Sequence, residues 1–180
     1  MIIINPNLNL VPIKLEDQEK LFGLMSEIYP AAYSNFWKED CEWYLNLCFS
    51  EKNLSKELAR SSSHYYFIEF NGFKAGILKY DFLLSPKQLE ISNAMKLHRL
   101  YLHSDLHGTG VAKALMNWME TEAKAKNLDF IWLEAMEQKQ QAKVFYEKMG
   151  YQLALTYQLE FDLLKPEFRG IHIYNKKIKD

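Results

Sequence analysis

The stretch from Tyr101 to Met116, YLHSDLHGTGVAKALM, constrains the fold more than any other part of this sequence. A strand-like run leads into a turn that contains Gly108 and Gly110, and an amphipathic helical pattern follows directly. Glycine adopts backbone angles that are closed to other residues, and its missing Cβ lets a ligand approach the backbone closely. Amide N–H groups at such a turn converge on a helix N-terminus, where the helix dipole favours an anion. The pattern therefore predicts a phosphate-binding turn between a strand and a helix.

Hydrophobic periodicity on both sides of this turn predicts the remaining elements. Asn71-Gly72 separates two β-rich runs at 64–70 and 73–82, a strong hairpin signal because both turn residues must tolerate positive φ. Further strands are expected at 8–15, 96–103, 130–136, 151–162 and 170–177, and helices at 17–29, 37–49, 54–60, 111–127 and 138–149. Pro12 indicates an edge strand, and Pro30 is expected to end the first helix. The order predicts a mixed α/β sheet with helices on both faces.

Composition narrows the class of ligand. A chain of 180 residues suits one domain, and its formal net charge of −1 gives no electrostatic footprint for nucleic acid, so a small-molecule ligand is favoured. Cys41 and Cys48 have no metal-ligand companions nearby, and we expect reduced thiols and no metal site. The N-terminus resembles neither a signal peptide nor an anchor, and no apolar run approaches a membrane span of roughly 20 residues. We therefore expect a cytoplasmic protein that does not associate with membranes.

The glycine turn taken alone leaves two interpretations open. Lys113 stands where a dinucleotide-binding fingerprint would need its third glycine, and no Walker phosphate loop is present. Glycine pairs are also common in ordinary loops, so the turn alone does not separate a binding role from a structural one. A second pattern further along favours the binding role, and it reads Ala142-x-x-Phe145-Tyr146-x-x-x-Gly150-Tyr151.

Together the two patterns resemble the GNAT superfamily of acyl-CoA-dependent N-acetyltransferases, and the resemblance covers most of the chain. That family's phosphate motif, Gln/Arg-x-x-Gly-x-Gly/Ala, corresponds here to the run from His107 to Ala112. Its later signature, Asn-x-x-Ala-x-x-x-Tyr-x-x-x-Gly-Phe, corresponds to the run from Lys139 to Tyr151. The resemblance implies an α+β fold in a single domain over 1–180, with a mixed, mostly antiparallel sheet of about seven strands.

The resemblance also implies acetyl-CoA as co-substrate and assigns residues to it. The amides that would hold the CoA pyrophosphate belong to His107, Gly108, Thr109, Gly110, Val111 and Ala112. The backbone near Leu102 and His103 would pair with the pantetheine arm and polarise the acetyl carbonyl. Tyr146 would protonate the departing thiolate, a role that suits a phenol because its reference pKa is about 10.

Two positions depart from the family pattern. His107 replaces the usual Gln or Arg, so its side chain need not add a permanent charge near the phosphates. Lys139 replaces an Asn that contacts the cofactor in the family; Lys139 would either reach a CoA phosphate or be solvated at the surface. Binding at this turn should therefore rest mainly on backbone amides.

Acetyl transfer to an amine also requires a base, because only the neutral amine is nucleophilic. Many family members place a Glu on the strand before the glycine turn, whereas the run 96–103, KLHRLYLH, has no acidic residue. His98 is the candidate base, since an imidazole titrates near neutral pH; the alternative is that it is a packed strand residue. Strand alternation puts His98 and His103 on opposite faces, so they should not act as a pair.

The acceptor site in this family is built by the first helices and the late strands. Tyr29, Tyr33 and Trp37 lie in the first of these regions near Glu39 and Asp40, a combination that would hold an aliphatic cation. The alternative is that the aromatic residues are core and the carboxylates are solvated.

The chain is also similar to bacterial polyamine (spermidine-type) acetyltransferases, for example in the run FYEKMGY. Lys96 and His98, however, occupy places that are acidic in that branch, and a cation-binding site would not welcome Lys96.

The sequence thus predicts transfer of an acetyl group from acetyl-CoA to a primary amine by direct attack. The acceptor would be a small molecule such as a polyamine, rather than a protein, although a peptide or amino-acid amine stays open. A homodimer is compatible with the family, whose C-terminal strands often pair between subunits. The rival hypothesis is a non-catalytic CoA-binding module on the same fold, and a longer acyl donor is a further enzymatic alternative.

Overall fold

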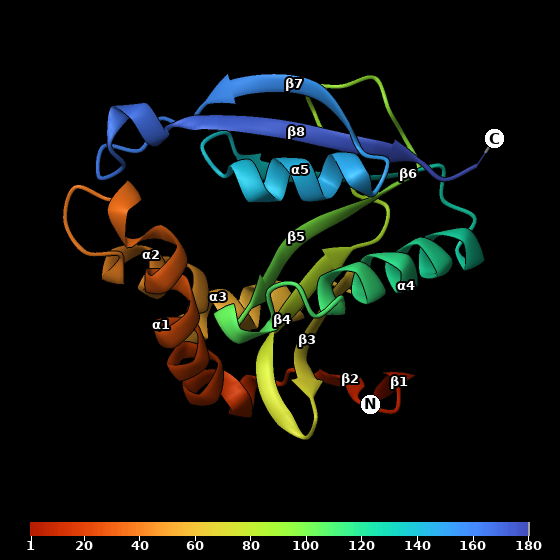
Figure 1. The fold of residues 1–180 in the computed structure, drawn as a ribbon, viewed down its shortest axis with the longest axis horizontal. Coiled ribbons are helices and arrows are strands. Elements are labelled where there is room, and N and C mark those ends of the chain that lie inside the picture. Colours follow the sequence, from red (N-terminus) through yellow and green to blue (C-terminus); the bar gives the residue numbers. More distant parts are fainter. Residues whose placement is uncertain (180) are drawn as a thin grey trace. The chain divides into compact units, whose positions relative to one another are not determined.

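The computed structural model describes residues 1–179, which divide into two compact units. The first comprises residues 1–80 and 99–115, and the second comprises residues 81–98 and 116–179. Strand β5 (Ala94–Leu102) and helix α4 (Val111–Ala125), labelled in Figure 1, each contribute residues to both units. The expectation of a single domain stays a prediction.

The first unit combines an antiparallel sheet with three helices. Its strands are β1 (Ile2–Asn5), β2 (Leu8–Pro12), β3 (Ser63–Phe70) and most of β4 (Phe73–Asp81), and its helices are α1 (Gln18–Tyr33), α2 (Glu42–Phe49) and α3 (Glu51–Leu58). β1 pairs antiparallel with β2, and β2 pairs antiparallel with β3. The turn from β3 to β4 has φ of 50° at Asn71 and 82° at Gly72, which confirms the predicted hairpin.

The second unit holds most of the C-terminal elements. They are β6 (Phe130–Met136), α5 (Gln140–Lys148), β7 (Gln152–Gln158) and β8 (Gly170–Lys177). β5 and β6 run parallel, whereas β8 pairs antiparallel with both β6 and β7. Ala94, Trp132 and Ile173 form a buried cluster at the centre of these strands.

The described residues form an eight-stranded sheet in the order β1-β2-β3-β4-β5-β6-β8-β7. This confirms the predicted mixed, mostly antiparallel α+β sheet, with one strand more than expected. The strands at 130–136 and 170–177 match their predicted bounds, and positive φ at Asn127 (59°) and Gly150 (84°) follows the ends of α4 and α5 as predicted. Within the described residues, no helix is long and apolar enough to cross a membrane.

Four local predictions were wrong. β2 is not an edge strand, because β1 pairs with it. Pro12 is tolerated because the pairing with β1 ends at Leu10, so no β1 residue lies opposite the proline. Pro30 lies inside α1 rather than at its end. Proline removes only its own N–H donor, and its carbonyl still accepts a hydrogen bond from the Ser34 N–H, so the helix continues past it.

The helix expected at 37–49 starts five residues later, at Glu42. Asp40 Oδ1 accepts a hydrogen bond from the Glu42 N–H at 2.9 Å, which satisfies one donor at the start of the helix. The next helix begins earlier than expected, at Glu51, because Ser50 Oγ caps it by accepting from the Asn53 N–H at 3.4 Å. A side-chain oxygen therefore accepts from an early N–H of each helix, and only in the second helix does it come from the N-cap residue itself.

Candidate functional site

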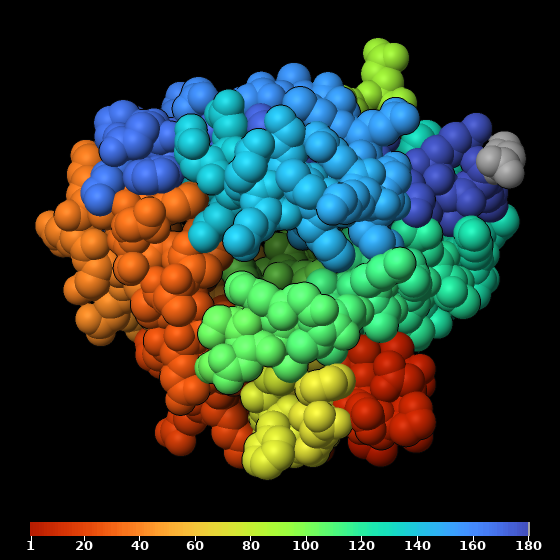
Figure 2. All heavy atoms as spheres, in the orientation of Figure 1, coloured from red at the N-terminus to blue at the C-terminus, as the bar shows by residue number. Residues whose placement is uncertain are grey.

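The glycine turn has the backbone conformation that the sequence predicts. Gly108 has φ of 77° and Gly110 has φ of 85°, both in the region that favours glycine. A Cβ at either position would meet no atom within 4 Å, so the need for glycine here comes from the backbone angles. All four residues from 107 to 110 are exposed, and the segment lies on the surface (green in Figure 2).

Helix α4 begins directly after this turn. The Ala114 N–H donates to the Gly110 carbonyl at 2.9 Å, which makes Gly110 the first acceptor of the helix. The N–H groups of Val111, Ala112 and Lys113 precede that bond and have no acceptor within the helix. Such N–H groups at the positive end of a helix dipole form a suitable site for a phosphate.

Two of the six predicted phosphate-binding amides are used within the turn itself. The His107 N–H donates to the Ser104 carbonyl at 3.0 Å, and the Thr109 N–H donates to the Leu106 carbonyl at 3.3 Å. Thr109 also donates its hydroxyl to the Leu106 carbonyl, at 2.7 Å. This narrows the candidate phosphate donors to the amides of Gly108, Gly110, Val111 and Ala112.

The end of β5 leads into the turn through Leu102 and His103. The His103 N–H donates to the Ala75 carbonyl of β4 at 2.8 Å, and His103 Nδ1 accepts from the Asp105 N–H at 3.4 Å. The His103 side chain therefore caps the short 3₁₀ turn at 104–106.

Gly76 of β4 lies against the end of β5, and the sequence patterns did not single it out. A Cβ on Gly76 would overlap the Tyr101 carbonyl oxygen and lie 3.1 Å from Leu102 Cα. β4 and β5 thus approach closely beside the predicted pantetheine segment because this residue is glycine. An isolated glycine inside a strand pattern was the available signal.

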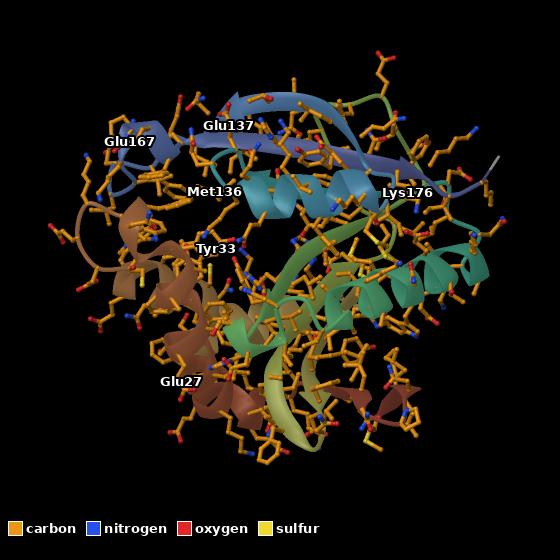
Figure 3. The ribbon with its side chains drawn as sticks, viewed as in Figure 1. Glu27, Tyr33, Met136, Glu137, Glu167 and Lys176 are labelled. Carbon is orange, nitrogen blue, oxygen red and sulfur yellow. The ribbon has the colours of Figure 1, made fainter. Side chains whose placement is uncertain are left out.

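The three predicted acceptor residues gather in one aromatic cluster of the first unit. Tyr29 stacks on Tyr33 and on Tyr44 with ring centroids 4.8 and 4.6 Å apart, and Tyr101 meets Tyr29 edge-on at 5.8 Å. Trp37 packs on Tyr44 at 5.3 Å. Tyr33 projects from the end of α1 (Figure 3). The sequence did not single out Tyr101, which β5 brings into this cluster.

The cluster is buried enough to keep its phenols protonated. Burial raises the pKa of Tyr33 to about 12 and raises that of Tyr29 further. Burial likewise raises the pKa of Tyr101, and the nearby Tyr44 adds to this effect. These hydroxyl groups are therefore neutral hydrogen-bonding groups at physiological pH.

A largely buried ion pair joins Arg99 of β5 to Glu57 of α3. Arg99 donates from Nη1 to both carboxylate oxygens of Glu57, at 2.7 and 3.0 Å, and its guanidinium packs on the rings of Phe49 and Tyr65. The ammonium of Lys79, whose side chain is only 1% exposed, lies 3.8 Å from the same carboxylate. Glu57 thus compensates buried positive charge in this unit.

The predicted general acid lies in the second unit. Tyr146 is on α5, and its ring contacts those of Tyr151 and Tyr174, each with a centroid separation of 6.0 Å. Lys139 is the residue before α5, and partial burial lowers the pKa of its ammonium. The structure places both residues at α5, as the second sequence pattern implies.

His98, the predicted base, lies beside a carboxylate that the sequence did not single out. Its Nε2 is 3.3 Å from Oδ2 of Asp81, the last residue of β4. The Asp81 side chain is fully buried, whereas His98 is 20% exposed. A buried carboxylate at this distance can orient an imidazole and stabilise its protonated form, as in a catalytic dyad.

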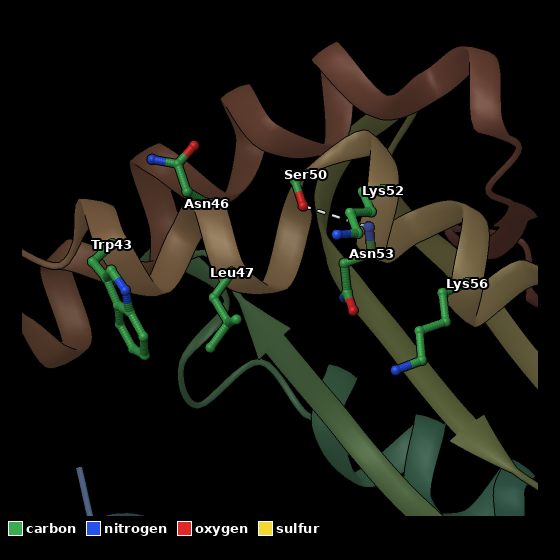
Figure 4. Close-up of a pocket in the computed structure, with 7 residues that line it drawn as sticks. All are labelled: Trp43, Asn46, Leu47, Ser50, Lys52, Asn53 and Lys56. Atoms are coloured by element: carbon green, nitrogen blue, oxygen red, sulfur yellow. Dashed lines mark hydrogen bonds between the residues drawn. The ribbon is translucent and has the colours of Figure 1, made fainter.

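One open groove of about 430 Å³ lies outside the predicted site. It runs between α2 and α3 and is shown in Figure 4. Its lining residues are Trp43, Asn46, Leu47, Ser50, Lys52, Asn53 and Lys56. None of these belongs to the predicted set. Among residues 1–179, no group of three or more His, Cys, Asp or Glu residues lies close enough to hold a metal ion.

Comparison with known proteins identifies the class to which this fold and glycine turn belong. Residues 22–151 match the sequence model of the Acetyltransferase (GNAT) family, and the chain belongs to that family. A curated relative, an uncharacterised N-acetyltransferase from Lactobacillus delbrueckii subsp. lactis, is 29% identical over 112 residues. That match covers 62% of this chain and 65% of the relative, so the chain spans just under two thirds of the relative's length.

Solved structures share the fold over nearly the whole chain. PaiA N-acetyltransferase from Thermoplasma acidophilum, in complex with coenzyme A, has a TM-score of 0.72 at 20% identity and covers 94% of this chain and 98% of its own. A variant of spermidine N-acetyltransferase SpeG from Vibrio cholerae has a TM-score of 0.68 at 17% identity, covering 97% and 95%. The ribosomal-protein-S18-alanine N-acetyltransferase from Escherichia coli has a TM-score of 0.69 at 14% identity, covering 96% and 95%.

These comparisons confirm the GNAT resemblance and its fold. The structural relatives include enzymes named for a polyamine and for an alanine of a ribosomal protein, at similar TM-scores. The polyamine branch therefore stays a prediction, and so do the roles of the individual site residues.

Proposed function

We propose that this protein transfers an acetyl group from acetyl-CoA to a primary amine by direct attack of the amine on the thioester. The observation that carries the proposal is the glycine turn at the start of α4, in a chain of the GNAT family. Positive φ at Gly108 and Gly110, followed by helix N–H groups without helical acceptors, fits a pyrophosphate held by backbone donors.

The CoA pyrophosphate would bind the amides of Gly108, Gly110, Val111 and Ala112. Backbone groups at Leu102 would pair with the pantetheine arm, since the His103 N–H already donates to Ala75. The His107 side chain would contribute little to CoA affinity, because an imidazole, unlike a guanidinium, carries no permanent charge.

Tyr146 would serve as the general acid. In the proposed step the amine nitrogen attacks the acetyl carbon, the C–S bond breaks, and the phenol gives its proton to the leaving thiolate. Tyr146→Phe should therefore lower kcat while leaving CoA affinity nearly unchanged. An unaltered kcat would remove Tyr146 from this role.

His98 would accept the proton that the amine must lose. Its contact with buried Asp81 supports this proposal, because the carboxylate would stabilise the imidazolium that forms. A pH–rate profile of His98→Ala identical to that of the native enzyme would refute the assignment, and Asp81→Asn should shift the same limb of the profile.

The acceptor would be a small amine, held by the aromatic cluster of Tyr29, Tyr33 and Trp37. Tyr29 and Trp37 are only 4% and 5% exposed, whereas Tyr33 is partly exposed, so Tyr33 would offer the cation–π contact to an aliphatic ammonium group with Tyr29 stacked behind it. A homodimer and a longer acyl donor remain compatible with this proposal.

The experiment that tests the proposal is thiol release from acetyl-CoA with a panel of amines. The panel should include polyamines, amino acids and peptides with free N-termini, and calorimetry with CoA should accompany it. Turnover with at least one amine is expected. Binding of CoA without turnover on any amine would favour the alternative, a non-catalytic CoA-binding module on the same fold.

A further inference from the structure

The second unit contains a chain of polar contacts that ends at the ring of Tyr146. It begins at Glu137, the residue after β6 (Figure 3), and passes through His172 and Tyr174 of β8. His172 is 8% exposed and Tyr174 is fully buried. Neither β8 residue belongs to the sequence patterns that identify the family, and the proposed mechanism assigns no role to any of the three.

The contacts in this chain follow one another in a defined order. His172 Nε2 lies 3.8 Å from Glu137 Oε1, and His172 Nδ1 lies 3.4 Å from the Tyr174 hydroxyl. The Tyr174 ring in turn lies 6.0 Å from the Tyr146 ring, at an interplanar angle of 37°. A carboxylate, an imidazole and a phenol therefore lead to the predicted general acid.

The direction of the Tyr174 hydrogen bond follows from its surroundings. Burial raises the pKa of Tyr174, and the charge of Glu147 adds to this effect. The hydroxyl therefore keeps its proton. The Glu137 carboxylate beside Nε2 favours a ring proton on that nitrogen, so that Nδ1 accepts from the Tyr174 hydroxyl. Glu137 and Tyr174 thus face the two ring nitrogens of His172.

Gly170 makes the position of Glu137 possible. The Glu137 N–H donates to the Gly170 carbonyl at 2.9 Å, and the Glu137 side chain lies directly over Gly170. A Cβ on residue 170 would overlap Glu137 Oε2 and approach its Cβ to 3.0 Å. Because residue 170 has no side chain, the Glu137 carboxylate has room to lie near His172.

We propose that His172 is a positioning residue for catalysis: held by Glu137, it anchors the Tyr174 hydroxyl, and the Tyr174 ring orients Tyr146. This inference rests on the proposed role of Tyr146 as general acid. A phenol must point its O–H at the leaving sulfur within a narrow angle, and a small misplacement of a catalytic group costs up to about 100-fold in rate. His172 touches none of the reacting atoms and acts through Tyr174.

The test compares two substitutions at His172. His172→Leu removes the acceptor for the Tyr174 hydroxyl and should lower kcat about tenfold, with little change in the KM for acetyl-CoA. His172→Asn places an amide oxygen near the position of Nδ1 and should restore most of that loss. If Asn and Leu lower kcat equally, or if Leu leaves kcat within twofold of the native value, the inference is overturned.

Two further variants keep the test independent of folding. Tyr174→Phe removes the same hydrogen bond but keeps the ring, and should lower kcat as His172→Leu does. Gly170→Ala displaces Glu137 while leaving His172 and Tyr174 unchanged, and should give a smaller loss of kcat in the same direction. Circular dichroism and Tm of each variant show whether it folds, and a normal kcat in folded Tyr174→Phe would contradict the inference.

Combining these changes with Tyr146→Phe separates the two proposals. A native kcat in Tyr146→Phe alone overturns the general-acid role, and the positioning role with it. If Tyr146→Phe lowers kcat and His172→Leu lowers it further by the same factor, His172 does not act through Tyr146. If His172→Leu has no additional effect in that background, both proposals are supported.

Discussion

Removing the negative charge of Glu57 should destabilise the protein severely. The carboxylate is 15% exposed, accepts two hydrogen bonds from Arg99, which is itself 12% exposed, and lies 3.8 Å from buried Lys79. Glu57→Gln keeps the shape of the side chain but leaves the guanidinium of Arg99 without its counter-charge. Breaking one partner of a buried pair costs about 3–5 kcal/mol. For a chain of this size that corresponds to a fall in Tm of roughly 6–20 °C.

The matched control is an exposed pair on the same chain. Lys14 and Glu16 lie 3.3 Å apart with side chains 69% and 74% exposed, so Glu16→Gln should cost at most about 0.5 kcal/mol. Thermal and urea unfolding followed by circular dichroism would measure both variants. A change in Tm for Glu57→Gln as small as that for Glu16→Gln would refute the view that the Arg99 pair is desolvated.

A double variant tests whether the cost comes from the uncompensated charge. Glu57→Met combined with Arg99→Met replaces the pair with apolar side chains, and such replacements of buried pairs are often neutral or stabilising. We expect the double variant to be more stable than Glu57→Gln alone. Lys79 keeps its charge in the double variant, so the difference from Glu57→Gln reports the charge of Arg99 alone; a double variant no more stable than Glu57→Gln would show that uncompensated Arg99 does not cause the loss.

Three further outcomes are expected. Stability should fall as the pH rises above about 10. The folded chain keeps phenols such as Tyr33, with a pKa of about 12, protonated, whereas the unfolded chain releases those protons. Tyrosinate absorbance should therefore rise together with unfolding. Gly110→Val should weaken CoA binding at least tenfold through its positive φ, whereas His107→Ala should change it less; calorimetry that gives the reverse order would contradict the backbone site. Gly76→Ala should force β4 away from the Tyr101 carbonyl and lower the free energy of unfolding by about 1–3 kcal/mol, measured as a lower denaturant midpoint; an unchanged midpoint would show that the strands adapt freely.

Local chemistry explains which elements the sequence predicted well. Asn71-Gly72 predicts its hairpin because few other dipeptides adopt positive φ at both positions, and the observed φ of 50° and 82° follow directly. The strands at 130–136 and 170–177 are continuous runs between clear breaks. The family patterns added what periodicity could not supply, namely the identity of the anion expected at Gly108 and Gly110.

The missed features depend on contacts between distant segments. β1 has only four residues, which alternate between intermediate and exposed, so its apolar signal is weak until β2 pairs with it. Pro30 ends a helix by local rules, yet α1 passes through it. Asp81 ends a buried run whose partner, His98, lies on the next strand, and no local pattern could place the carboxylate 3.3 Å from the imidazole.

Lys96 shows how such a contact changes a functional argument. From the sequence, a lysine on the strand before the glycine turn counts against a cationic acceptor, because it replaces an acidic residue. In the structure, its ammonium lies 2.7 Å from Glu134 and 4.4 Å from the centre of the Trp132 ring, while the Tyr157 hydroxyl donates to the other Glu134 oxygen at 2.9 Å. The lysine charge is therefore compensated within its own unit. Since a compensated charge repels a second cation only weakly, Lys96 gives little reason to exclude polyamines from the acceptor panel.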